Sequence, residues 1–192
     1  MSVARSNPSC ISGSNFSYQI TRLLPFPITM SNMAEGNPEK AMEYFKQAYD
    51  KQVEGEYREA VELYTKSIAA FPTAEGYTFR GWAYSYLEDY EQAIADCMQA
   101  IELDPGFGNP YNDIGAYLIE TGKPEEAIPW LQKAIEAKRY EARCYPHYNL
   151  GRVYEGQRNW KKARACYERA MAENSEYIAP IKALRRLTAM FN

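Results

Sequence analysis

The sequence has few of the residues that build metal sites and active sites. Its 192 residues contain one histidine, His147, and four cysteines that never form a C-x-x-C pair. A zinc site needs about four ligands at characteristic spacings, and this inventory does not supply them. The Gly-rich stretch 104–110 follows a predicted helix rather than a strand, which argues against a dinucleotide-binding loop or a P-loop. We therefore expect no metal, no cofactor and no enzymatic activity.

Long apolar runs and excess positive charge are also missing. No stretch approaches the roughly 18 uninterrupted apolar residues that cross a bilayer, so no membrane association is expected. The formal net charge of −3 argues against nucleic acid as a partner. Because the cysteines occur singly, we expect reduced thiols and a cytoplasmic protein. The short basic runs Lys161-Lys162 and Arg185-Arg186 are interpreted as solvated helix faces.

Residues 1–34 contain seven serines and no acidic residue. Their apolar stretch 23–28 is interrupted by two prolines, which makes it too short for a secretory core. We interpret this segment as an unfolded tail. Two alternatives stay open: an organelle transit peptide, which would place the protein in an organelle, or a translation start at Met30 or Met33.

The rest of the chain contains an internal repeat. Four alanines in a shared context recur at separations of 33, 34 and 36 residues: Ala60, Ala93, Ala127 and Ala163. Twelve positions before each of them stands another small residue: Ala48, Gly81, Gly115 and Gly151. Small residues at fixed positions of two successive helical patterns indicate helices that approach closely. A period in this range predicts stacked helix–turn–helix units.

The repeated motifs resemble those of the tetratricopeptide repeat family. The third and fourth units carry them most clearly: Tyr111-x-x-Ile114-Gly115-x-x-Leu118 with Ala127-x-x-x-Leu131, and His147-x-x-Leu150-Gly151-x-x-Tyr154 with Ala163-x-x-x-Tyr167. The resemblance implies an all-α, right-handed superhelical solenoid over residues 35–192. We place its units at 41–73, 74–107, 108–143 and 144–177, followed by a capping helix at 178–191.

The resemblance also implies a function. In this family the first helix of each unit lines a concave groove that binds peptides, so we expect a non-enzymatic adaptor for a protein or peptide partner. The predicted groove residues are aromatic in the early units and more polar in the later ones: Phe45, Tyr49, Phe79, Trp82, Tyr86, Asn109, Asn112, Asp113, Tyr145, Tyr148, Asn149 and Arg152. Aromatic anchors suit a partner's apolar side chains, and the asparagines suit its backbone. Packing of helix against helix remains an alternative role for each aromatic residue.

Two further expectations concern the partner. Chaperone-binding members of the family hold terminal carboxylates with a clamp of Lys, Asn and Arg side chains. In the two possible frames the clamp positions hold rings, amides, Thr78 and Asp113 but no cation, so we expect no such clamp. The alternative function is a structural scaffold that self-associates through the solenoid ends or through exposed tyrosines.

Overall fold

The computed structural model describes residues 36–190, and this part of the chain forms nine α-helices and no β-strand. The all-α fold class predicted from the sequence is confirmed. The expectations for residues 1–34 concern a segment outside the described residues. The helices are α2 (Pro38–Glu54), α3 (Tyr57–Ala70), α4 (Ala74–Tyr86), α5 (Tyr90–Leu103), α6 (Asn109–Glu120), α7 (Pro124–Glu136), α8 (Cys144–Gly156), α9 (Trp160–Glu173) and α10 (Ile178–Met190).

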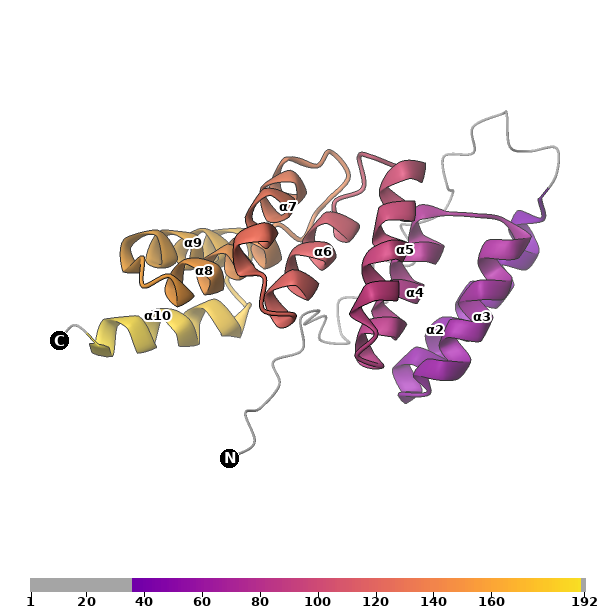
Figure 1. Cartoon of the computed structure of the whole chain (residues 1–192), viewed down its shortest axis with the longest axis horizontal. Helices are drawn as coiled ribbons and strands as arrows, with labels where there is room; N and C mark the ends of the chain where they lie inside the picture. Colours follow the sequence, from indigo (N-terminus) through magenta and orange to yellow (C-terminus); the bar gives the residue numbers. More distant parts are fainter. Residues whose placement is uncertain (1–35, 191–192) are drawn as a thin grey trace.

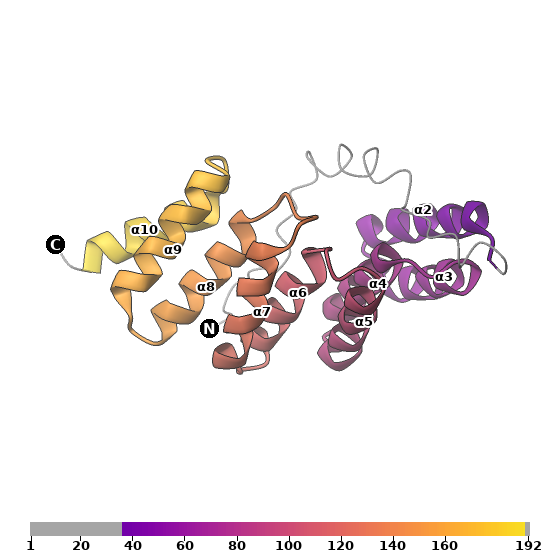
Figure 2. The ribbon, with the colours of Figure 1, turned by 90° about the horizontal axis from the view of Figure 1, so that it is seen from above.

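The helices pack as consecutive pairs that stack along the long axis of the molecule (Figure 1). The pairs are α2–α3, α4–α5, α6–α7 and α8–α9, and α10 packs on α9 at the end of the stack. Seen from above, each pair is turned relative to the one before it (Figure 2). The first helices also contact one another in succession, α2 with α4, α4 with α6 and α6 with α8. Within residues 36–190 the second helices make no comparable contacts, so the first helices lie on the inner side of the curve.

Small residues set the distance between the two helices of each pair. The four repeated alanines of the second helices, Ala60, Ala93, Ala127 and Ala163, are completely buried. Opposite them, a Cβ atom added to Gly151 would lie 2.3 Å from the ring of Tyr167, and one added to Gly115 would lie 2.5 Å from Leu131. Such contacts are far below van der Waals distance, so these helices can approach only because glycine has no side chain.

Local sequence explains where several helices begin and end. Side-chain oxygens of Asn37, Thr73, Asp89 and Asn159 accept hydrogen bonds from the backbone N–H three residues later, which satisfies a free donor of the first turn.

Each of the four turns inside a pair contains one residue with a left-handed backbone. Two of these residues are glycines and two carry side chains: Gly55, Glu88, Gly122 and Arg158, with φ of 84°, 64°, 79° and 56°.

The last helix closes the stack by apolar and ionic contacts. Ala183 and Leu187 of α10 are buried against Ala163 and Tyr167 of α9. Glu155 of α8 accepts hydrogen bonds from the Tyr167 hydroxyl at 2.6 Å and from Arg186 of α10 at 2.7 Å. An open end of a solenoid would expose its apolar face, so α10 covers what the fourth pair leaves uncovered.

Neither a membrane span nor a metal site is found in residues 36–190. No helix there is long and apolar enough to cross a bilayer. No group of three or more His, Cys, Asp or Glu side chains comes together in the arrangement that holds a metal ion in this part of the chain. His147 is buried on α8, and burial lowers its pKa, so its imidazole is neutral at pH 7.

Candidate functional site

Four of the five predicted groove residues of the first two pairs form an aromatic cluster on α2 and α4. The ring centroid of Phe79 lies 5.0 Å from that of Phe45, 6.2 Å from that of Tyr49 and 4.6 Å from that of Trp82. Phe45, Phe79 and Trp82 are buried, and Tyr49 is half-buried. Edge-to-face and tilted ring contacts of this kind hold the rings in fixed positions. The cluster is therefore a rigid apolar floor between the inner helices, and Tyr49 is its half-buried member.

A chain of polar side chains continues from this cluster across α4, α6 and α8. The indole N–H of Trp82 donates to one carboxylate oxygen of Asp113, and the amide of Asn112 donates to the other at 3.2 Å. The side-chain amide of Asn149 in turn donates to the side-chain oxygen of Asn112 at 3.2 Å. We call these four residues the polar relay. All four are buried, and together they join three consecutive pairs through their first helices.

The carboxyl group of Asp113 has an unusual protonation equilibrium. Burial raises its pKa from 3.8 to about 7, against the opposing effect of the hydrogen bonds from Trp82 and Asn112. The other ionisable groups that face it are Cys97 of α5, Tyr117 of α6 and Tyr140 of the connector before α8. Burial raises the pKa of each of these three as well, so all remain neutral near pH 7. No cation of the described residues pairs with Asp113.

Two predicted residues of α8 form a third group with an aromatic residue that the sequence analysis did not single out. The ring of Tyr177, in the connector before α10, lies 5.1 Å from that of Tyr145 and 5.3 Å from that of Tyr148. All three are half-buried. The repeat pattern gives no signal for Tyr177, because the residue falls at the end of the last unit.

Three other predicted residues do not join these groups. Tyr86 stacks on Tyr57 of α3 with ring centroids 4.4 Å apart. Arg152 donates to Glu120 of α6 at 2.8 Å, which links the third and fourth pairs. Asn109 is half-buried at the first position of α6.

The twelve predicted residues therefore divide into two classes. Six are buried and form a floor: Phe45, Phe79, Trp82, Asn112, Asp113 and Asn149. Six are half-buried: Tyr49, Tyr86, Asn109, Tyr145, Tyr148 and Arg152. The buried class holds the inner helices together, so packing is a demonstrated role for its members.

A curved stack of helix pairs with a continuous strip of aromatic and amide side chains on its inner helices defines a helical-repeat protein-interaction module. Three family models described as tetratricopeptide repeat match this chain, at residues 74–107, 109–140 and 144–177. The chain belongs to the tetratricopeptide repeat family.

Comparison with individual proteins supports the same assignment. The chain is 37% identical over 82 residues to small glutamine-rich tetratricopeptide repeat-containing protein 2 of Saccharomyces cerevisiae, a match that covers 42% of this chain and 24% of the relative. It spans a quarter or less of the length of the curated relatives it matches.

Solved structures show similar folds. The structure titled as the functional characterisation of Pseudomonas aeruginosa pilF superposes with a TM-score of 0.73 at 19% identity, over 79% of this chain and 69% of that chain. At this identity the likeness shows the fold alone. The second tetratricopeptide domain of Spaghetti (RPAP3), bound to the HSP90 peptide SRMEEVD, is 30% identical with a TM-score of 0.50, over 53% of this chain and 94% of that chain.

Proposed function

We propose that this chain is a non-enzymatic adaptor that binds an extended segment of a partner protein along its inner helices. One observation carries the proposal: an aromatic cluster and a polar relay follow one another on α2, α4, α6 and α8. An extended segment alternates the directions of its side chains and presents backbone amides along its length. The half-buried rings of Tyr49 and Tyr148 can hold its apolar side chains, and the half-buried amide of Asn109 can bond its backbone.

The charge of this surface favours a segment without clustered carboxylates. Asp113 is an acid whose neighbours in the described residues are neutral, and Arg152 is already paired with Glu120. A terminal carboxylate placed at the chaperone-clamp positions would meet rings and this acid instead of lysines. We therefore propose that the groove takes a partner different from the acidic peptide SRMEEVD that occupies the second domain of Spaghetti (RPAP3).

The test uses half-buried residues, since truncating the buried floor would disturb the fold. A peptide is first selected against the full chain from a phage-displayed random library, and its affinity is measured by fluorescence polarisation. The groove variant is Tyr49→Ala/Tyr148→Ala. The matched control is Tyr44→Ala/Tyr154→Ala, which removes two half-buried tyrosines from the same two helices. Tyr44 lies beneath Lys40 and Tyr154 beneath Lys162, on other helix faces.

We expect the groove variant to lose at least about tenfold in affinity, because an interface anchor typically contributes 1 kcal/mol or more. The control should change by less than about twofold, with both variants keeping the helical circular dichroism of the original chain. Equal losses in the two variants, or none in the groove variant, would remove the basis for the proposed groove.

The alternative function is a scaffold that self-associates. Its proposed tyrosine surface would be made of half-buried rings, because no tyrosine of residues 36–190 is fully exposed. Association through the solenoid ends is the other route. Light scattering over a concentration series separates the two functions, since a protein that stays monomeric at every concentration cannot be a self-assembled scaffold.

We also propose a cytoplasmic location for the adaptor. The three cysteines of the described residues, Cys97, Cys144 and Cys166, are free and buried. Free thiols are typical of proteins in reducing compartments. Imaging of the full chain, with a fluorescent protein fused after Asn192, tests this location against an organelle.

A further inference from the structure

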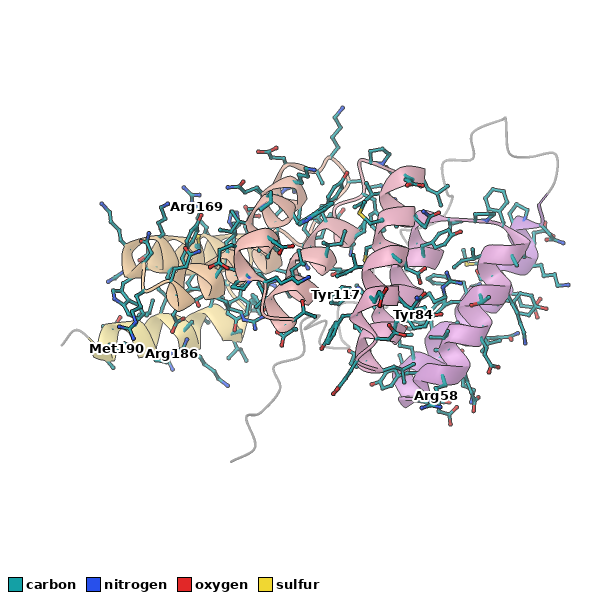
Figure 3. All side chains as sticks on the ribbon, viewed as in Figure 1. Arg58, Tyr84, Tyr117, Arg169, Arg186 and Met190 are labelled. Atoms are coloured by element: carbon teal, nitrogen blue, oxygen red, sulfur yellow. The ribbon has the colours of Figure 1, made fainter. Side chains whose placement is uncertain are left out.

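The charges of the solenoid are strongly segregated along its axis. Residues 36–143 contain 20 acidic and 11 basic residues, whereas residues 144–190 contain 4 acidic and 9 basic residues. The first three pairs therefore carry a net charge of −9, and the fourth pair with α10 carries +5. Figure 3 places Arg169 and Arg186 at this basic end and Arg58 at the other end of the long axis. The overall charge of −3 hides this asymmetry.

A cleft of about 780 Å³ lies at the basic end, between the turn that joins α8 to α9, the first turns of α9 and the last turns of α10. Its walls hold three cations, Arg158, Lys161 and Arg164. Trp160 and the buried Leu187 give it an apolar part. It is separate from the aromatic cluster and the polar relay, and none of its lining residues belongs to the predicted groove.

The cations of this cleft differ from four other arginines of the solenoid. Arg80, Arg139, Arg152 and Arg186 each make an ion pair with a carboxylate on another element. No hydrogen bond or ion pair within residues 36–190 involves the side chains of Arg158 and Lys161. Arg164 pairs only with Glu168 one turn later, and both side chains are more than half exposed, so this pair is weak.

We propose that this cleft docks an acidic segment of a second partner protein, one that carries clustered carboxylates around a single apolar side chain. The carboxylates of such a segment complement Arg158, Lys161 and Arg164, and its apolar side chain contacts Trp160 and Leu187. Charge complementarity at a surface site guides the approach of a partner and discriminates against others. With the inner groove occupied by a different segment, the adaptor joins two proteins.

The surroundings favour a short acidic segment over nucleic acid or a second copy of the chain. A nucleic acid strand is a long polyanion, and the acidic pairs next to the cleft would repel its extension. A second copy would have to insert a folded acidic helix pair into a site about as large as a few side chains. The start of α9 adds to the preference for carboxylates: the first turns of α3, α5 and α7 contain acidic residues, whereas that of α9 contains none.

The test measures binding of a fluorescein-labelled probe peptide, Gly-Ser-Glu-Glu-Leu-Glu-Glu-Gly-Ser, to the full chain. Two control peptides replace the four glutamates by glutamine, or the leucine by serine. The cleft variant is Lys161→Gln/Arg164→Gln. Its matched control, Arg169→Gln/Lys182→Gln, removes the same charge from exposed positions of α9 and α10 that do not line the cleft.

We expect saturable binding of the probe, at least tenfold weaker binding of the glutamine peptide and weaker binding of the serine peptide. The cleft variant should bind the probe at least fivefold more weakly, with less than a twofold change in the control variant. The cleft variant should also keep its full affinity for a peptide selected on the groove, so the two sites fail independently.

Three results overturn the proposal. Equal losses of probe affinity in the cleft and control variants would mean that the overall positive charge of this end, and not the cleft, binds the peptide. Tighter binding of a fluorescein-labelled single-stranded RNA than of the probe, lost in the cleft variant, would assign the cleft to nucleic acid. A concentration-dependent dimer in sedimentation velocity that the cleft variant abolishes would assign it to a second copy of the chain.

Discussion

The indole N–H of Trp82 on α4 donates a hydrogen bond to the buried carboxyl group of Asp113 on α6, which lies 31 positions further along the chain. The contact joins the second and third pairs at their inner helices. It also places an acid where its charge is poorly solvated, and burial raises the pKa of Asp113 to about 7. A predicted groove residue thus carries an intramolecular contact.

This arrangement predicts a pH dependence of stability. The pKa of Asp113 is higher in the folded state than its ordinary value of 3.8, so the folded state binds more protons between about pH 4 and pH 7. The contribution of Asp113 to the free energy of unfolding is therefore most favourable below pH 4. It is lost as the pH rises to 7, because the buried carboxyl group then has to ionise. Asp113→Asn removes the charge and keeps a carbonyl acceptor for Trp82. We expect it to raise the free energy of unfolding at pH 7.5 by roughly 1–3 kcal/mol.

Urea denaturation of both proteins at several pH values checks this prediction. The difference between variant and original chain should shrink toward pH 4, where Asp113 is protonated in the folded state and partly protonated in the unfolded chain. Comparing the two proteins at each pH cancels the contribution of His147, whose lowered pKa makes the folded state less stable in acid. A constant difference between pH 4 and 7.5 would contradict the assigned pKa.

A second prediction concerns the closest helix approach. Gly151→Ala places a methyl group 2.3 Å from the fully buried ring of Tyr167, and we expect it to lower the free energy of unfolding by about 1–3 kcal/mol. Gly156→Ala on the same helix is the control, because nothing lies within 4 Å of its added methyl group. The control should be neutral or stabilise by up to about 1 kcal/mol through helix propensity. Thermal unfolding followed by circular dichroism measures both.

The spacing of small residues was enough to predict the helix pairs, because close helix packing requires small residues at the same positions of every repeat. Ala93, Ala127 and Ala163 are completely buried for this reason. The inner face was less predictable. The sequence places Asn112 and Asn149 on inner helices, but their hydrogen bond depends on how two pairs are turned relative to each other, which no single repeat encodes.

Features outside the repeat register could not be inferred at all. Tyr177 is the final residue of the fourth unit, where the repeat pattern has no fixed position, yet it packs on two tyrosines of α8. Of the two basic runs interpreted as solvated faces, only Lys161 lines the cleft, and its position beside α10 depends on the path of the chain after Glu173.

A third prediction concerns the left-handed turn residues. Glu88 has φ of 64° at the turn position where the first and third pairs have glycine. A residue with a side chain is disfavoured in this conformation by roughly 1–2 kcal/mol. We expect Glu88→Gly to stabilise the chain by about 1 kcal/mol, part of the gain being offset by the greater freedom of glycine in the unfolded chain. Gly122→Ala should lower the free energy of unfolding by a similar amount, although there is open space around the added methyl group. Denaturant midpoints that move in the same direction for the two variants would contradict this reasoning.

A fourth prediction concerns Arg139, in the connector between α7 and α8. Its guanidinium donates to Glu75 at 2.7 Å and to Asp104 at 2.8 Å, and it lies 4.1 Å over the ring of Phe107. Glu75 is only 4% exposed, so Arg139→Ala leaves a buried carboxylate without its cation. We expect a loss of about 2 kcal/mol in the free energy of unfolding, less than for a fully buried pair because Arg139 itself is partly solvated. Arg139→Lys should recover only part of this loss, since one ammonium cannot reproduce the planar fork that bonds two carboxylates.

A double-mutant cycle separates this ion pair from the other contacts of Arg139. Glu75→Gln removes the buried charge, so adding Arg139→Ala to it should cost clearly less than Arg139→Ala alone. The remaining cost then reports the contacts with Asp104 and Phe107, which hold the connector against the second pair. If the two substitutions were simply additive, Glu75 would not depend on Arg139. The geometry of the connector would then rest on its backbone hydrogen bonds, Arg139 N–H to the Gly106 carbonyl at 2.9 Å and Gly108 N–H to the Arg139 carbonyl at 3.1 Å.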